Sequence, residues 1–197
     1  MVVSQNSIND LRDGRVLPGV RWKSKIYFAT VAVVAGFMVY RQMTSPERPG
    51  EVAVGASAPD FKIKDESGKA IQLSDYRGKV VLLNFFRTDC APCIAEMPSL
   101  ARLNKEFQSR RFQMLIISGD TDWQAVDDFY AEQHLSLPTF LDPGWNVYHQ
   151  YKLTGTPETF LIGSDGAVIK HVIGARAWTD PSIVAYVNEL VGRGDVD

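Results

Sequence analysis

Two cysteines, Cys90 and Cys93, are the residues of this sequence best suited to chemistry, and they form one C-x-x-C motif. The motif follows the apolar run Val80–Phe86 and opens a segment with helical periodicity. On a helix, residues three positions apart lie side by side, so a small backbone adjustment brings both sulfurs to disulfide distance. The helix N-terminus should favour the thiolate of Cys90, while Cys93, one turn further in, is suited to resolve a mixed disulfide.

A zinc half-site and a static structural disulfide are two other interpretations of such a pair. A zinc site needs a second pair of ligands, but the sequence has no second C-x-x-C, and its three histidines show no H-x₃-H spacing. A structural disulfide across so short a loop would stabilise the fold little. The motif therefore favours thiol–disulfide exchange without a bound metal or cofactor.

The composition limits the class of protein. The chain has 197 residues, a net charge of −2, and 45% hydrophobic residues. This much apolar material excludes disorder throughout, and two cysteines exclude a disulfide-rich scaffold. The near-neutral charge argues against a nucleic-acid binder. The length allows one ordinary domain plus additional segments.

The charges are unevenly distributed along the chain. Residues 1–50 carry seven Lys or Arg and three Asp or Glu, a net of +4. The whole chain has 21 Lys or Arg and 23 Asp or Glu. Residues 51–197 therefore hold 14 basic and 20 acidic residues, a net charge of −6. The sign changes just after one apolar run, which indicates that the two parts lie in different surroundings.

The uncharged run Ile26–Tyr40 predicts a single membrane anchor. Counted from Trp22, the helix would span about 28 Å, close to the thickness of a bilayer core. A cleaved signal peptide and a buried core helix are the alternatives, but the leader is long, no A-x-A-like site follows, and the flanking charges disfavour a core position.

The positive-inside rule assigns an orientation to this anchor, because the basic residues concentrate before it. We expect residues 1–21 in the cytoplasm, 22–40 in the lipid bilayer of the cytoplasmic (inner) membrane, a linker at 41–53, and a folded domain at 54–197 on the periplasmic or extracytoplasmic side.

Strands and helices alternate along the rest of the chain, which predicts an α/β sandwich. We expect strands at Ala58–Lys64, Ala70–Leu73, Val80–Phe86, Phe112–Ile117, Pro138–Leu141, Thr159–Ile162 and Val168–Ile173. We expect helices at about Cys90–Ser109, Thr121–His134, Trp145–Tyr151 and Thr179–Val191. The first two strands form a hairpin.

The segment Asn84–Pro98 resembles the active-site stretch of thioredoxin-like proteins of the TlpA/ResA/CcmG (DsbE) type. Three further stretches match this family in the same order: Ala58–Phe61, Leu73–Lys79 and Gly155–Ile162. The resemblance implies a thioredoxin fold, which is a central mixed β-sheet sandwiched by helices, here with an N-terminal β-hairpin extension. It also implies membrane tethering and thiol–disulfide exchange outside the cytoplasm.

The resemblance further implies the partners. The substrate would be a disulfide-containing exported protein, for example apocytochrome c or a metal-site assembly factor, which the dithiol keeps reduced. The electrons would come from a membrane-embedded or extracytoplasmic thiol donor. No nucleic acid is expected.

Glu96 lies three residues after Cys93 and thus on the same side of the helix. In the family the matching glutamate is held to assist the proton transfers of the cysteines. A partly buried carboxylate with a raised pKa could exchange a proton with Cys93. The alternative is an ordinary solvated glutamate.

Thr156 and Pro157 belong to the family-like stretch before a strand. The resemblance implies a cis Thr156–Pro157 bond beside the cysteines, which would leave the Thr156 backbone free to pair with a substrate strand. The alternative is a trans proline that starts an edge strand.

The sequence departs from the family at two positions that could tune the cysteine pKa values. Asp89 replaces the tryptophan that usually precedes the first cysteine, and its carboxylate should raise the pKa of the Cys90 thiol. Asp89 could equally cap the helix, and Arg87 is one possible counter-charge. Asn84 stands where cytoplasmic thioredoxins carry a buried aspartate, so the proton-transfer role falls to Glu96.

Two other functions are compatible with parts of the sequence. A peroxiredoxin shares the fold and the Ala-Pro-Asp-Phe opening, but Leu83 and Arg87 occupy the Pro and Thr positions of its P-x-x-x-T-x-x-C signature. A Sco-like copper protein would use C-x-x-x-C with a distal histidine. We assign the tryptophans Trp123, Trp145 and Trp178 to packing or to the surface.

Overall fold

The computed structural model describes residues 52–108 and 110–193. Within them, five strands form one sheet: β3 (Val80–Phe86), β4 (Phe112–Ser118), β5 (Thr139–Leu141), β6 (Glu158–Ile162) and β7 (Val168–Ile173). Their order across the sheet is β5-β4-β3-β6-β7. The pairs β3–β4 and β4–β5 are parallel, whereas β3–β6 and β6–β7 are antiparallel. The sheet is therefore mixed, with the apolar strand β3 at its centre.

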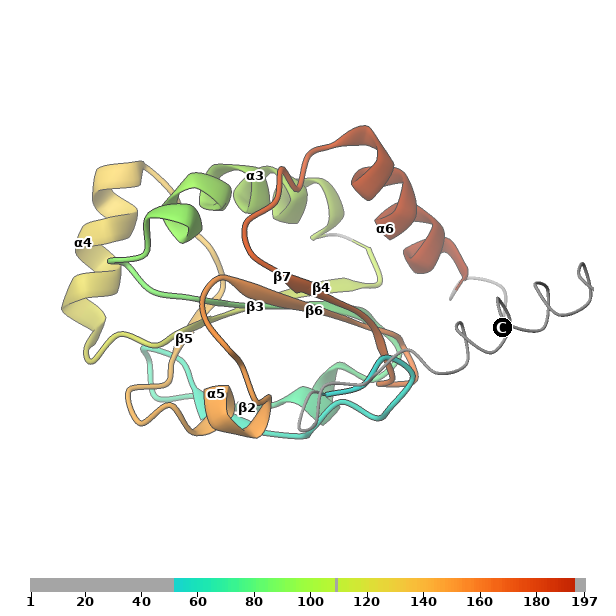
Figure 1. The fold of residues 1–197 in the computed structure, drawn as a ribbon, viewed down its shortest axis with the longest axis horizontal. Helices are drawn as coiled ribbons and strands as arrows, with labels where there is room; N and C mark the ends of the chain where they lie inside the picture. Colours follow the sequence, from blue (N-terminus) through green and yellow to red (C-terminus); the bar gives the residue numbers. More distant parts are fainter. Residues whose placement is uncertain (1–51, 109, 194–197) are drawn as a thin grey trace, which may run out of the picture. The chain divides into compact units, whose positions relative to one another are not determined.

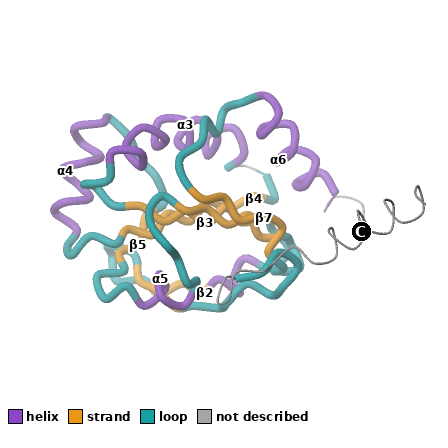
Figure 2. Tube along the Cα trace, in the orientation of Figure 1, coloured by secondary structure: helices purple, strands orange, loops and turns teal. Residues whose placement is uncertain are grey.

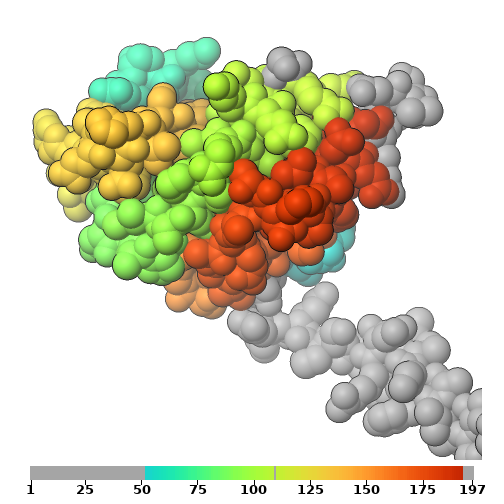
Figure 3. Space-filling model, turned by 90° about the horizontal axis from the view of Figure 1, so that it is seen from above, coloured from blue at the N-terminus to red at the C-terminus, as the bar shows by residue number. Residues whose placement is uncertain are grey.

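Three helices cover one face of this sheet, and a thinner layer covers the other (Figure 1). The first layer holds α3 (Ala91–Phe107), α4 (Trp123–Gln133) and α6 (Pro181–Arg193). The second holds the hairpin β1 (Lys62–Lys64) and β2 (Ala70–Gln72), the 3-10 helix η1 (Leu73–Tyr76) and α5 (Asn146–Gln150). Figure 2 shows the strands enclosed between the two layers, and Figure 3 looks down on α4, α3 and α6.

Strand β3 contributes to a separate hydrophobic core on each face because side chains alternate along a strand. Val81, Leu83 and Phe85 pack into the core beneath the β1–β2 hairpin and α5. Leu82 and Phe86 pack into the core beneath α3 and α6. Asn84 lies between Leu82 and Phe86 on the same face of the strand, so its side chain also points toward α3.

The structure confirms the thioredoxin fold, the mixed sheet and the N-terminal hairpin. Most of the predicted boundaries lie within two residues of the observed ones. The first hairpin differs most, because only Lys62–Lys64 and Ala70–Gln72 pair, with Leu73 already in η1. The cap residues explain two helix starts: Cys90 caps α3, which starts at Ala91, and Asp122 caps α4, which starts at Trp123.

The predicted cytoplasmic segment 1–21, the anchor 22–40 and nearly all of the linker 41–53 lie outside the described residues. In the part of the chain that the structure describes, no helix has the length and apolarity needed to cross a membrane.

Candidate active site

The cysteine pair lies where the loop after β3 meets the N-terminus of α3. Cys90 is the N-cap residue of α3, and its Sγ accepts a hydrogen bond from the backbone N–H of Cys93 at 3.3 Å. The two sulfurs are joined in a disulfide, with the Cα atoms 5.2 Å apart. Cys90 is half-buried, whereas Cys93 is fully buried. The structure therefore presents one sulfur of the pair to partners and shields the other.

Asp89 does not cap the helix, contrary to one of the two interpretations of the sequence. Its carboxylate instead pairs with Arg87, with Nη2 and Oδ2 2.8 Å apart, and its side chain is 66% exposed. The Arg87 guanidinium also lies 5.4 Å from the centre of the Trp145 ring. Arg87 is thus the counter-charge of Asp89.

A buried aspartate, Asp120, holds the loop that leads to the cysteines. Its carboxylate accepts hydrogen bonds from the backbone N–H of Thr88, at 3.1 Å, and from the Thr88 hydroxyl, at 2.8 Å. The Ser118 hydroxyl donates to it at 2.6 Å. Sequence reasoning missed Asp120, although its position just after the buried strand β4, parallel to β3, was a usable signal.

The loop before β6 approaches the exposed sulfur. The Thr156–Pro157 bond is cis, as the sequence predicted. The carbonyl oxygen of Thr156 lies 3.5 Å from Cys90 Sγ. Two of the predicted site residues, on segments 66 positions apart, are therefore in contact.

Glu158 stabilises this loop through hydrogen bonds, a role that the sequence analysis did not predict. Its Oε1 accepts hydrogen bonds from the Thr154 backbone N–H and hydroxyl, both at 2.7 Å, and from the Gly155 N–H at 3.0 Å. Its Oε2 lies 2.6 Å from Nε2 of His171 on β7. Burial alone would raise the pKa of Glu158, but these hydrogen bonds outweigh it and hold the pKa below its usual value.

Glu96 is buried one helical turn beyond Cys93, with 2% of its surface exposed. Its carboxylate accepts three hydrogen bonds: from Asn84 Nδ2 at 2.9 Å, from the Arg176 backbone N–H at 3.0 Å and from Trp178 Nε1 at 2.9 Å. Burial raises the pKa of Glu96, and the three hydrogen bonds only partly reverse the shift. The burial and the three hydrogen bonds exclude the alternative of a solvated glutamate.

Asn84 and Trp178 orient this carboxylate. The Asn84 amide also donates to Thr159 Oγ1 at 2.8 Å, so both of its N–H groups have acceptors. Trp178 is buried, as expected for a packing residue, but its indole N–H donates to Glu96. No local pattern indicates this contact, because 82 positions separate the two residues.

Comparisons with known proteins agree with this geometry. The AhpC/TSA family profile matches residues 54–171. The thiol-disulfide oxidoreductase ResA of Bacillus cereus is 32% identical over 173 residues, which cover 85% of this chain and 98% of ResA. The ResA of Bacillus subtilis is 33% identical, over 81% of this chain and 87% of that protein. The chain belongs to the TlpA/ResA/CcmG family of thioredoxin-like proteins.

A solved structure supports the same assignment for this ResA-like protein. A thiol:disulfide interchange protein of the thioredoxin family from Chlorobium tepidum superposes with a TM-score of 0.60 at 26% identity. The match covers 71% of this chain and 99% of that chain. The relatives and the Cys90–Cys93 disulfide identify the protein as a thiol–disulfide oxidoreductase.

Proposed function

We propose that this protein is a membrane-anchored, extracytoplasmic reductase of disulfides in exported proteins. The observation that carries the proposal is the asymmetry of the pair: Cys90 is accessible at the helix N-terminus, while Cys93 is fully buried behind it. An accessible thiolate can attack a bulky partner, whereas a buried thiol can reach only its neighbour.

The reaction starts from the reduced dithiol. The Cys90 thiolate attacks one sulfur of the partner disulfide, a mixed disulfide forms, and the other partner sulfur leaves as a thiolate that takes up a proton. Cys93 then loses its proton and attacks Cys90 Sγ, which releases the second partner thiol. The partner gains two electrons and two protons, and Cys90–Cys93 becomes the disulfide seen here.

Glu96 is proposed to accept the proton of Cys93. Its raised pKa brings proton exchange closer to neutral pH, where a carboxylate is a more effective base. The Asn84 amide can serve both protonation states: its N–H donates to the carboxylate, and its Oδ1, which has no partner among the described residues, could accept from the acid after an amide flip.

Thr156 and Pro157 are proposed to line the substrate site. Because the Thr156 carbonyl lies 3.5 Å from Cys90 Sγ, a substrate cysteine bound to Cys90 lies beside the Thr156 backbone. A substrate segment in extended conformation can form backbone hydrogen bonds there. Glu158 would keep this loop at its distance from Cys90.

The membrane anchor rests on the sequence. The uncharged run within residues 22–40 and the excess of basic residues before it support a single span with a cytoplasmic N-terminus. Labelling of the full chain in intact cells tests this topology. In the Cys90→Ala/Cys93→Ala background, Ser4→Cys should resist an impermeant maleimide and Lys105→Cys should react; the reverse pattern would contradict the proposed orientation.

Trapping of partners tests the reaction. The Cys93→Ala variant of the full chain should accumulate mixed disulfides with exported proteins, because the resolving thiol is absent. The matched control is the Cys90→Ala/Cys93→Ala double variant, which cannot form them. If both variants give the same adducts, or none, Cys90 is not the attacking residue.

A further inference from the structure

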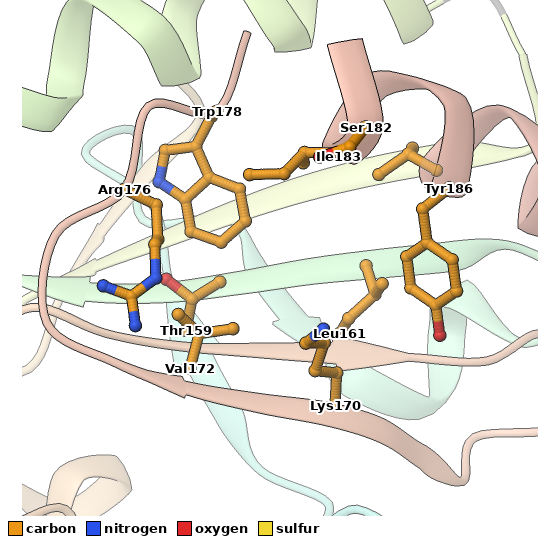
Figure 4. Close-up of a pocket in the computed structure, with 10 residues that line it drawn as sticks. Thr159, Leu161, Lys170, Val172, Arg176, Trp178, Ser182, Ile183 and Tyr186 are labelled. Carbon is orange, nitrogen blue, oxygen red and sulfur yellow. The ribbon is translucent and has the colours of Figure 1, made fainter. Parts of the chain in front are cut away.

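A cavity of about 320 Å³ lies between the sheet and α6, with the Trp178 ring at one end (Figure 4). Its floor is one face of two paired strands, where Thr159 lies opposite Val172 and Leu161 opposite Lys170. Its volume falls at the lower end of the range for small-molecule sites. The cavity is thus large enough for a compact ligand.

The cavity is apolar in its interior. Leu161 and Val172 line the floor, and Ile183 of α6 lies across from them (Figure 4); Val187 of α6 also lines the cavity. The two aromatic rings, Trp178 and Tyr186, stand at the two ends in Figure 4. A ligand that fills this space needs an apolar body.

The charged groups of the cavity have one sign. Lys170 and Arg176 line it, and among the described residues no carboxylate does. Arg176 is held in place because its Nη1 and Nη2 donate to the carbonyls of Ala175, at 2.9 Å, and Ile173, at 3.3 Å. Lys170 Nζ lies 5.6 Å from the centre of the Tyr186 ring.

These two cations are unusual in their setting. Residues 51–197 carry a net charge of −6, yet neither Lys170 nor Arg176 forms an ion pair with a carboxylate within the ranges that the structure describes. Three of the five guanidinium N–H groups of Arg176 remain for another acceptor. The cavity is therefore complementary to an anion with an apolar tail.

We propose that this cavity binds a small amphiphilic carboxylate, with its carboxylate between Lys170 and Arg176 and its apolar body between the sheet and α6. The site is distinct from the thiol chemistry, because neither cysteine lines it. It is nevertheless adjacent to the proton-transfer group, since Trp178 forms one wall and donates its N–H to Glu96.

The test is calorimetric titration of the oxidised full chain in detergent micelles with 4-phenylbutyrate, corrected with protein-free micelles. The carboxylate should bind at one site, the neutral 4-phenylbutanol about tenfold more weakly, and the cationic 4-phenylbutylamine not measurably. Because no electrons are transferred, the result does not depend on whether the protein is a reductase.

Two variants locate the site. Lys170→Gln should raise the Kd for 4-phenylbutyrate about five- to tenfold, whereas the same change at Lys62, on the opposite face of the sheet, should leave it unchanged. Ile183→Trp should fill the cavity and abolish binding. The proposal is overturned if no saturable heat appears, if the three ligands bind alike, or if Lys170→Gln and Lys62→Gln behave alike.

Discussion

Two carboxylates flank the cysteine pair in sequence, and their environments in the structure are opposite. Asp89, adjacent to Cys90 in sequence, is two-thirds exposed and paired with Arg87. Glu96, three residues beyond Cys93, is buried and accepts three hydrogen bonds. Burial raises the pKa of Glu96, whereas the charge of Asp89 is screened by water and by its partner. Two carboxylates that are both near the cysteines in sequence thus lie in opposite environments.

The largest effect is expected from removing the acid–base function of Glu96. Glu96→Gln keeps the shape of the side chain but removes the proton acceptor, so the step in which Cys93 resolves a mixed disulfide should slow about 100-fold. The measurement is the rate of glutathione release from a preformed Cys90–glutathione adduct. The matched control is Glu106→Gln on the exposed face of the same helix; equal rates in the two variants would remove Glu96 from the mechanism.

The second prediction contrasts Glu96 with Glu158 through the pH dependence of stability. The pKa of Glu96 is raised in the folded state, so this group contributes to the free energy of unfolding. The contribution is full below the unfolded-state pKa of about 4.3 and is lost as the pH rises through the folded-state pKa. The lowered pKa of Glu158 gives a contribution that is present above about 4.3 and lost as the pH falls.

Urea unfolding of the two glutamine variants between about pH 3 and 8 checks these signs. Glu158→Gln should cost about 2 kcal/mol at neutral pH, and the deficit should shrink in acid. The free energy of unfolding of Glu96→Gln should increase relative to that of the wild type as the pH rises. Parallel curves for all three proteins would show that neither glutamate titrates differently in the folded state.

The third prediction concerns the hydrogen bond from Trp178. Trp178→Phe keeps an aromatic ring in the core but removes a donor to the Glu96 carboxylate, which should raise the pKa of that carboxyl further. The pH midpoint of the resolving step should move upward accordingly. Trp123→Phe is the matched control, and an unmoved midpoint in Trp178→Phe would show that this contact does not tune Glu96.

The smallest effect is expected at the exposed pair. Asp89→Asn should change the rate of Cys90 attack less than about fivefold, because exposed ion pairs contribute about 1 kcal/mol or less. The direction is an increase, since removal of the carboxylate favours the Cys90 thiolate. The alkylation rate of reduced Cys90 at several pH values gives the answer, and a tenfold change would show that Arg87 does not offset Asp89.

The sequence predicted the fold well because its signals are local. The apolar run Val80–Phe86 is buried along its whole length, and the C-x-x-C motif begins a helix as expected. Pairing across the sheet could not be read from local patterns, although the resemblance supplied it.

The site was predictable only where its residues belong to contiguous motifs. Cys90, Cys93, Glu96, Thr156 and Pro157 lie on two such stretches. Two further residues that support them, Asp120 and Trp178, contact partners on distant segments: Asp120 accepts from Thr88, and Trp178 donates to Glu96. Such contacts depend on how separate segments pack, and an aspartate or tryptophan has no periodicity that indicates its partner.

The reaction of each cysteine alone with oxidised glutathione tests the central claim most directly. In the folded full chain, Cys93→Ala leaves Cys90, which should form a glutathione adduct readily. Cys90→Ala leaves the buried Cys93, which should react at least about 100-fold more slowly until the protein is unfolded in urea. Intact-mass spectrometry over time gives both rates. Equal rates, or a faster Cys93, would contradict the assignment of Cys90 as the attacking residue and Cys93 as the resolving one.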